Sequence, residues 1–129
     1  MKIATIFHMG QESYNLGKDG EERACNFLQQ KEFRIIERNF RSRQGEIDII
    51  AKDQDFLVFV EVKNYSHKSF FTPIYAIRKS KKESIIHAAK LYIYKKKLYN
   101  TLCRFDVVAI YRHISGEIII DHIKNSFGI

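Results

Sequence analysis

Residues 45–63 read GEIDIIAKDQDFLVFVEVK, a stretch that predicts two β-strands joined by a tight turn. Its two halves, Glu46–Lys52 and Phe56–Lys63, are rich in the β-branched and aromatic residues that favour strands. The polar link Asp53-Gln54-Asp55 is short, and an antiparallel hairpin is the economical connection across so few residues. The stretch therefore predicts a β-hairpin.

This hairpin brings charged side chains together. A two-residue turn at Gln54-Asp55 pairs residue n with residue 109 − n, which places Asp48 opposite Glu61. Lys63 follows on the same face, because side chains alternate along a strand. Directly opposed residues have β-carbons about 4.5–5.5 Å apart, and like charges at that spacing are destabilising unless a cation compensates. Asp48 and Glu61 are therefore candidate ligands for Mg²⁺, and Lys63 is a candidate stabiliser of developing negative charge.

A simpler interpretation of the same residues stays open. Glu61 and Lys63 also fit an ordinary ion pair at an exposed strand end, a type of pair that contributes about 0–1 kcal/mol. The spacing alone does not separate the two interpretations. The metal-site interpretation is favoured by two features outside the hairpin, a glutamate on the inward face of a helix and a separate basic helix, which are described below.

A helix is predicted upstream, from Leu16 to about Gln30, with Asn15 as its N-cap. Its inward face recurs at three- and four-residue steps and consists of Gly17, Glu21, Ala24, Cys25 and Leu28. Glu21 thus shares the buried face, and it would supply a further carboxylate if the helix packs beside the hairpin. Residues 1–13 show no periodicity and are treated as an N-terminal extension without an assigned role.

The remaining predicted elements complete an α/β pattern. They are a strand over Phe33–Phe40, a helix from Lys79 to about Lys97 after a break at Thr72-Pro73, and strands over Arg104–Tyr111 and Glu117–Ile123. The order of elements is helix, three strands, helix, two strands. It predicts a single α/β domain over residues 14–129, with helices flanking a central mixed β-sheet.

Composition excludes several classes of protein. The chain has 129 residues, 45% of them hydrophobic and 29% charged, with one proline and six glycines, which excludes collagen-like and disordered chains. Two isolated cysteines are too few for a disulfide scaffold or a paired-cysteine zinc site. No apolar run approaches the roughly 18 residues of a membrane span, and the N-terminus lacks a secretion signal. We therefore expect a cytoplasmic protein with no membrane partner.

The positive charge is concentrated in one segment. The net charge is +7, and residues 78–97 carry the whole excess while the remainder balances. A local basic stripe is typical of a protein that follows phosphates, although a solvated lysine-rich helix would look the same. The candidate nucleic-acid-binding residues are Arg38, Arg41, Arg43, Arg78, Lys79, Lys81 and Lys82.

Several spaced motifs give the chain a resemblance to a known family. They are Gly17-Lys18-Asp19-Gly20-Glu21, Gly45–Ala51, Phe59–Lys63, Arg104–Ala109 and His122–Phe127. Over residues 14–127 the sequence resembles the UPF0102 (YraN) family. That family is linked through its fold to restriction-endonuclease-like nucleases, particularly the archaeal Holliday-junction resolvases. The resemblance implies a restriction-endonuclease-like architecture and a nuclease.

The resemblance also implies site residues. The PD-(D/E)xK pattern of that superfamily falls on Asp48, Glu61 and Lys63, with Glu21 matching the helix glutamate of resolvase-like members. Ile47 stands where the motif name has proline. The basic helix uses lysines where the family often has arginines, which keeps the charge but loses bidentate phosphate recognition.

The combined expectation is a Mg²⁺- or Mn²⁺-dependent endonuclease acting on structured or branched DNA. Asp48, Glu61 and Glu21 would form the metal site, with Lys63 stabilising the transition state or positioning water. A homodimer is expected by analogy with resolvases, which cut two strands. Two alternatives remain: a non-catalytic module that binds DNA or RNA, and a basic domain that binds an acidic protein.

Overall fold

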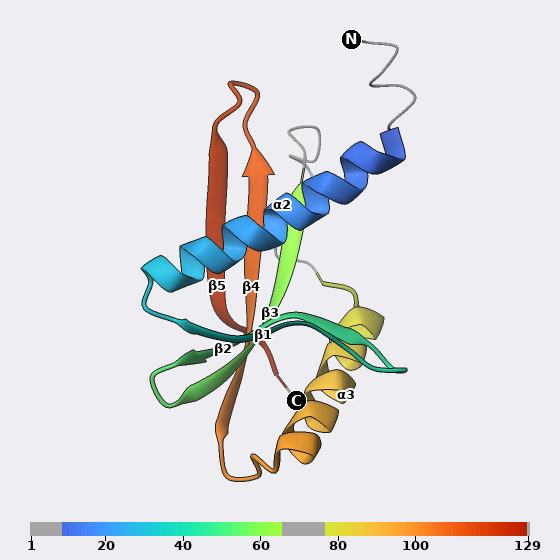
Figure 1. Cartoon of the computed structure of the whole chain (residues 1–129), viewed down its shortest axis with the longest axis vertical. Helices are drawn as coiled ribbons and strands as arrows, with labels where there is room; N and C mark the ends of the chain where they lie inside the picture. Colours follow the sequence, from blue (N-terminus) through green and yellow to red (C-terminus); the bar gives the residue numbers. More distant parts are fainter. Residues whose placement is uncertain (1–8, 66–76, 129) are drawn as a thin grey trace.

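A computed structural model of the chain describes residues 9–65 and 77–128, with residues 9–18 described by their backbone alone. Within that part, two helices and five strands follow one another along the chain (Figure 1). They are α2 (Met9–Gln30), β1 (Arg34–Arg41), β2 (Glu46–Asp53), β3 (Phe56–Tyr65), α3 (Lys79–Lys96), β4 (Leu102–Arg112) and β5 (Ile118–Phe127).

The strands form one mixed sheet in the order β1-β2-β3-β4-β5. β3 and β4 are parallel, and the other neighbouring strands are antiparallel. A parallel pair needs a long crossover connection, and α3 lies within the crossover here. The predicted α/β class with a mixed sheet is therefore confirmed.

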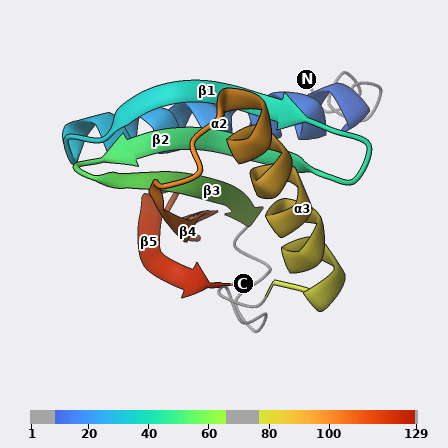
Figure 2. The same ribbon diagram turned by 90° about the horizontal axis from the view of Figure 1, so that it is seen from below.

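The two helices cover opposite faces of this sheet, α2 crossing over β3–β5 in Figure 1 and α3 flanking the sheet in Figure 2. Alternate β3 residues separate the two cores. Leu57 and Phe59 pack with Ile85 and Tyr92 of α3, whereas Val58 and Val60 join the α2 core. The α2 side is completed by Ala24, Cys25 and Leu28, which are buried as the helical spacing predicts.

The hairpin register is confirmed. Asp53 pairs with Phe56 and Ile49 pairs with Val60, so paired residue numbers add to 109. Gln54 adopts a φ of 54°, a left-handed conformation that asparagine and glycine favour and other residues rarely adopt. The short polar link thus makes the turn that fixes which side chains face each other.

The predicted start of the first helix is wrong. α2 begins at Met9, so Asn15 lies inside the helix and residues 9–13 of the predicted extension are helical. The sequence prediction relied on apolar periodicity, which marks only the part of a helix that packs on other elements. The first buried residue of α2 among the described side chains is Gly20.

α3 begins and ends close to its predicted limits. Arg78 is its N-cap and makes no side-chain capping hydrogen bond, while Lys97 closes it with a φ of 56°. The predicted break at Thr72-Pro73 lies outside the described residues. In the described part of the chain, neither helix is long and apolar enough to span a membrane.

A buried polar cluster ties β4, β5 and the end of β2 together. Asp106, fully buried, accepts hydrogen bonds from Arg104 Nε at 2.9 Å and from the Asn125 backbone N–H at 3.0 Å, and His122 Nε2 lies 2.8 Å from it. Arg104 also donates to Asp53 at 2.9 Å. Buried charges are tolerated when they are paired and hydrogen-bonded in this way.

Candidate active site

The site forms where β2 and β3 separate. Their paired register ends at Ile49 and Val60, one residue short of Asp48 and Glu61. Beyond that point the Val62 backbone N–H donates to Asp48 Oδ2 at 2.8 Å. A buried N–H needs an acceptor, so this bond fixes the Asp48 side chain within the fork between the strands.

Glu61 lies beside Asp48 and meets two lysines. Its side chain is only 5% exposed, and its Oε2 lies 3.5 Å from Lys63 Nζ and 3.7 Å from Lys81 Nζ. Glu61 Oε1 is buried and has no hydrogen-bond partner. A buried carboxylate oxygen without a partner is costly, and such an atom is found where a water or an ion completes the site.

The electrostatics of the fork follow from this crowding. Burial, and after it the neighbouring Glu61 carboxylate, raise the pKa of Asp48 to about 7, against the opposing effects of the Val62 N–H and Lys81. Two carboxylates in one partly dehydrated site cannot both ionise freely. A proton on Asp48, or a cation bound between the two carboxylates, would relieve this repulsion.

Glu21 approaches from the α2 layer. Burial raises its pKa first and the charge of Asp48 second, while a hydrogen bond with the Asn39 side chain lowers it. The position of Glu21 follows from a close approach of its helix to β3: a β-carbon on Gly20 would lie 3.1 Å from Asn64 Nδ2. Gly20 precedes Glu21 and Asn64 follows Lys63, so this approach brings the helix glutamate near the strand that carries Glu61.

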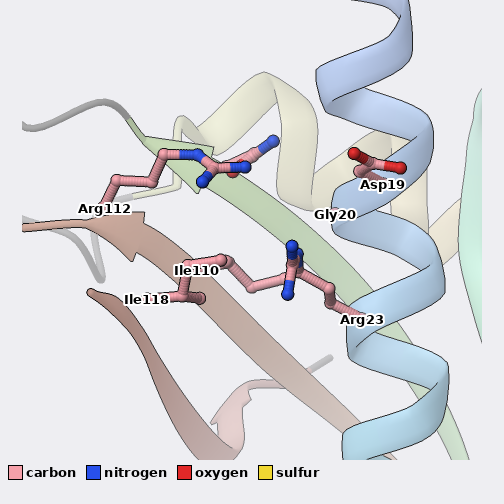
Figure 3. A pocket seen from close by; sticks show the side chains of 7 residues that line it. Asp19, Gly20, Arg23, Ile110, Arg112 and Ile118 are labelled. Atoms are coloured by element: carbon pink, nitrogen blue, oxygen red, sulfur yellow. The ribbon is translucent and has the colours of Figure 1, made fainter. Parts of the chain in front are cut away.

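Figure 3 shows the surroundings of that approach on the α2 face. Arg23 of α2 and Arg112 of β4 extend into a narrow hollow beside Asp19 and Gly20, with Asn64 among its lining residues. The hollow measures about 10 Å³, which is room for a single water molecule. It is too small for a substrate group.

A wider, basic hollow adjoins the fork at Lys81. Its volume is about 300 Å³, and its lining residues are Arg41, Ser42, Arg43, Gln44, Gly45, Glu46, Lys81 and Ser84. The β1–β2 turn contacts α3 closely there, because a β-carbon on Gly45 would lie 2.5 Å from the Ser84 carbonyl oxygen. Only glycine permits this contact without a shift of the backbone. Lys81 belongs to both the hollow and the carboxylate site.

The seven predicted nucleic-acid-binding residues fall into two groups, those that line the hollow and those that do not. Arg38 pairs with Glu22 of α2 at 2.9 Å, and Arg41 pairs with Glu46 at 3.5 Å. Arg78 and Lys79 are exposed at the start of α3, and the Lys82 ammonium lies 5.9 Å from the centre of the Phe127 ring. The structure thus brings Arg41, Arg43 and Lys81 into one hollow and sets the other four apart from it.

Lys81 and Asn39 are the site neighbours that sequence reasoning missed. The sequence marked Lys81 only as a phosphate contact, yet it contacts Glu61. A signal existed: Lys81 precedes the buried Ile85 by four residues, which puts both on the same face of a helix. Asn39 carried no such signal, since its neighbour Glu21 is remote in sequence.

The carboxylates of the site do not form a closed cage of ligands. Among the described side chains, those of residues 19–65 and 77–128, no group of three or more His, Cys, Asp or Glu is arranged to hold a metal ion. Asp48 and Glu61 adjoin, whereas Glu21 is linked to them through the charge of Asp48, which raises the pKa of Glu21. The arrangement offers two carboxylates, two lysines and a nearby basic hollow.

Comparison with known proteins finds one matching family model and a group of similar proteins. The model of an uncharacterised protein family, UPF0102, matches residues 20–110. The chain belongs to the UPF0102 family. A UPF0102 protein of Caldicellulosiruptor saccharolyticus is 41% identical over 113 residues, covering 87% of this chain and 96% of the relative.

Further UPF0102 relatives match to a similar extent. One from Clostridioides difficile is 44% identical over 111 residues, covering 86% of this chain and 95% of its own length. One from Trichlorobacter lovleyi is 38% identical over 122 residues, covering 94% and 96%. The resemblance drawn from the spaced motifs is confirmed, and residues 20–110 include Glu21, Asp48, Glu61, Lys63 and Lys81.

Proposed function

We propose that this UPF0102 protein is a metal-dependent endonuclease that hydrolyses phosphodiester bonds in structured or branched DNA. The observation that carries the proposal is the fork between β2 and β3, where the buried Glu61 adjoins Asp48 and meets Lys63 and Lys81. The fork lies beside a basic hollow suited to a phosphate backbone. A restriction-endonuclease-like architecture remains part of this proposal.

Asp48 and Glu61 fit a hard divalent cation such as Mg²⁺ or Mn²⁺. Both supply carboxylate oxygens, and Glu61 Oε1 has no other partner. Mg²⁺ is commonly bound by one or two carboxylates, with waters and substrate phosphate completing its shell, so two protein ligands suffice. When bound, such a cation lowers the pKa of an attacking water and offsets charge on the phosphoryl oxygens.

The chain's own groups supply the other requirements. The Lys63 ammonium, 3.5 Å from Glu61, is placed to stabilise negative charge that develops on the phosphate or to orient water. Glu21 is placed to organise the Asp48 side of the site through its charge and its bond with Asn39. Arg41 and Arg43 are placed to hold a flanking phosphate in the hollow.

The start of α3 also favours a phosphate. Its first turn contains no acidic residue, and its N-cap makes no side-chain hydrogen bond. The free N–H groups of a helix N-terminus attract anions, while the lysines in this turn are unfavourable next to the positive end of the helix dipole. A bound phosphate would accept hydrogen bonds from the free N–H groups and would also offset the charge of the lysines.

The test is cleavage of labelled duplex, single-stranded, flapped and four-way-junction DNA with Mg²⁺ or Mn²⁺. We expect wild type to cut at least one structure, and Asp48→Asn and Lys63→Ala to retain binding but lose cleavage by about 100-fold or more. Matched controls are Asp55→Asn in the exposed hairpin turn and Lys90→Ala on the exposed face of α3. Loss of activity in the controls would contradict the assignment.

A second candidate is a non-catalytic nucleic-acid-binding module. It is favoured by the absence, over the described residues, of a preformed group of three metal ligands, together with the basic start of α3. Binding without cleavage on every substrate and metal would support it.

The third candidate is a basic domain that binds an acidic protein, and it predicts that the chain binds nucleic acid no better than it binds other polyanions. Homodimer formation and a cytoplasmic location remain predictions.

A further inference from the structure

Lys81 is in contact with two chemically different regions. Its ammonium lies 3.7 Å from Glu61 Oε2, and the same residue lines the hollow that contains Arg41 and Arg43. The Lys81 side chain is 35% exposed, whereas that of Glu61 is 5% exposed. A long, partly exposed side chain at such a boundary can turn from one region to the other by rotation about its own bonds.

Lys63 and Lys81 differ in what holds them. Lys63 is on the same strand as Glu61, two residues on, so its position follows from the alternation of β3. Lys81 comes from a different element, and its position depends on the contact of Gly45 with the Ser84 carbonyl. Glu61 Oε2 therefore has two lysine partners. Lys63 is fixed by its place on the same strand, whereas Lys81 depends on how α3 packs against the β1–β2 turn.

A cation and Lys81 would compete for the same oxygen. A divalent ion bound by Asp48 and Glu61 brings two positive charges next to the Lys81 ammonium, and charges of one sign that close repel strongly in a buried site. Release of Lys81 would turn its charge toward a hollow that holds two arginines, Arg41 and Arg43, and one carboxylate, Glu46. The charge of these groups together is then positive, and a bound anion would compensate it. Metal and phosphate would thus each favour binding of the other.

We propose that Lys81 is a positioning residue that neutralises Glu61 in the metal-free protein, is displaced when a divalent cation binds, and then contacts a phosphate of the nucleic acid. This rests on the proposed function, since it takes Asp48 and Glu61 as the cation ligands. It makes metal and DNA binding reciprocally coupled, because two ligands that bias one element affect each other by the same factor.

The test is Mn²⁺ binding by calorimetry, with and without a nuclease-resistant phosphorothioate duplex or junction. In the absence of DNA, Lys81→Gln should bind Mn²⁺ about fivefold more tightly than wild type, at the low end of couplings between sites. DNA should tighten Mn²⁺ binding in wild type and much less in Lys81→Gln. Lys81→Arg, which keeps the charge, should restore the wild-type coupling.

The matched control is Lys82→Gln. It removes the same charge one residue along the same helix, but its ammonium lies over the Phe127 ring. We expect Lys82→Gln to leave Mn²⁺ affinity without DNA unchanged. A thermal melt at pH 8 checks that all variants are folded.

The outcomes separate this inference from the proposed function. If Lys81→Gln binds Mn²⁺ no more tightly than wild type does, or if Lys82→Gln has the same effect, the role of Lys81 is wrong while the metal site stands. If wild type binds no Mn²⁺ with or without DNA, the assignment of Asp48 and Glu61 as metal ligands is wrong, and the proposed role of Lys81 is then wrong as well. Both conclusions come from Mn²⁺ binding alone and do not require that the protein cleaves DNA.

Discussion

Asp48 is the residue at which stability and function are opposed. Its carboxyl is held in a buried fork beside Glu61, and this environment raises its pKa from 3.8 to about 7. An acid whose pKa is raised on folding binds protons more tightly in the folded state, so the free energy of unfolding decreases as pH rises between the two pKa values. Above about pH 7 the ionised Asp48 destabilises the metal-free protein.

We therefore predict that Asp48→Asn stabilises the protein in the presence of a chelator. The gain should be about 2–4 kcal/mol in the free energy of unfolding at pH 8 and should shrink toward zero as pH falls to about 4. Urea unfolding at pH 4, 6 and 8 measures it. Asp55→Asn, in the exposed turn of the same hairpin, should show no such pH dependence. Equal stability of Asp48→Asn and wild type at pH 8 would contradict the prediction.

At this scale the sequence predicted the pair but not its surroundings. Asp48 and Glu61 face each other because a two-residue turn and period-two alternation are local properties, readable from residues 45–63. Lys81 reaches Glu61 only because Gly45 lets α3 approach the β1–β2 turn, a contact between elements that no local pattern describes. The bond from Val62 N–H to Asp48 likewise depends on where two strands separate.

Among the elements, strands were easier to predict than helix ends. Every predicted strand is present, with ends displaced by a few residues, because its apolar run is bounded by turn residues. α2 extends to Met9, ahead of the residues at which the apolar periodicity of the sequence begins. The parallel pairing of β3 with β4 follows from the intervening α3 crossover, which the order of elements already favoured.

β4 and β5 are held together by the cluster around Asp106. Burial would raise the pKa of Asp106, but hydrogen bonds from His122, Arg104 and the Asn125 N–H outweigh it and lower that pKa below 3.8. A lowered pKa means that this carboxylate stabilises the fold at neutral pH, and that the stabilisation is lost as pH falls through the folded pKa. This effect has the opposite sign to that of Asp48.

We predict that Asp106→Asn destabilises the protein by about 3–5 kcal/mol at pH 7, because it leaves the buried Arg104 with one carboxylate partner instead of two. The deficit should begin to narrow below about pH 5, where the carboxyl of the unfolded chain starts to take up a proton, and should keep narrowing below pH 3.8, because the folded carboxylate holds its charge to lower pH. Urea unfolding across that range measures it, with Asp55→Asn as the control for a changed surface charge. A deficit that stays constant with pH would show that packing, not charge, holds the cluster.

At the scale of the whole molecule, the question is which end of α3 meets the nucleic acid. The helix has 18 residues and is about 27 Å long, so its two ends are separated by more than twice the roughly 8–10 Å over which charges act at physiological salt. The hollow with Arg41 and Arg43 adjoins the first turns of α3. The second basic group, Lys95, Lys96 and Lys97, lies at the far end.

We predict that the salt dependence of DNA binding comes from the first end alone. The triple variant Arg41→Gln, Arg43→Gln, Lys81→Gln, which removes the three basic residues of the hollow, should reduce the slope of log affinity against log salt by about 2.7, because each phosphate that is no longer neutralised lowers the slope by about 0.9. The triple variant Lys95→Gln, Lys96→Gln, Lys97→Gln removes the same three charges from a net +7 and should change the slope by less than about 1. Fluorescence anisotropy from 50 to 300 mM salt, about the range in which counterion release dominates, measures both slopes. Equal reductions in the two variants would mean that net charge, and not a phosphate path into the fork, attracts the nucleic acid.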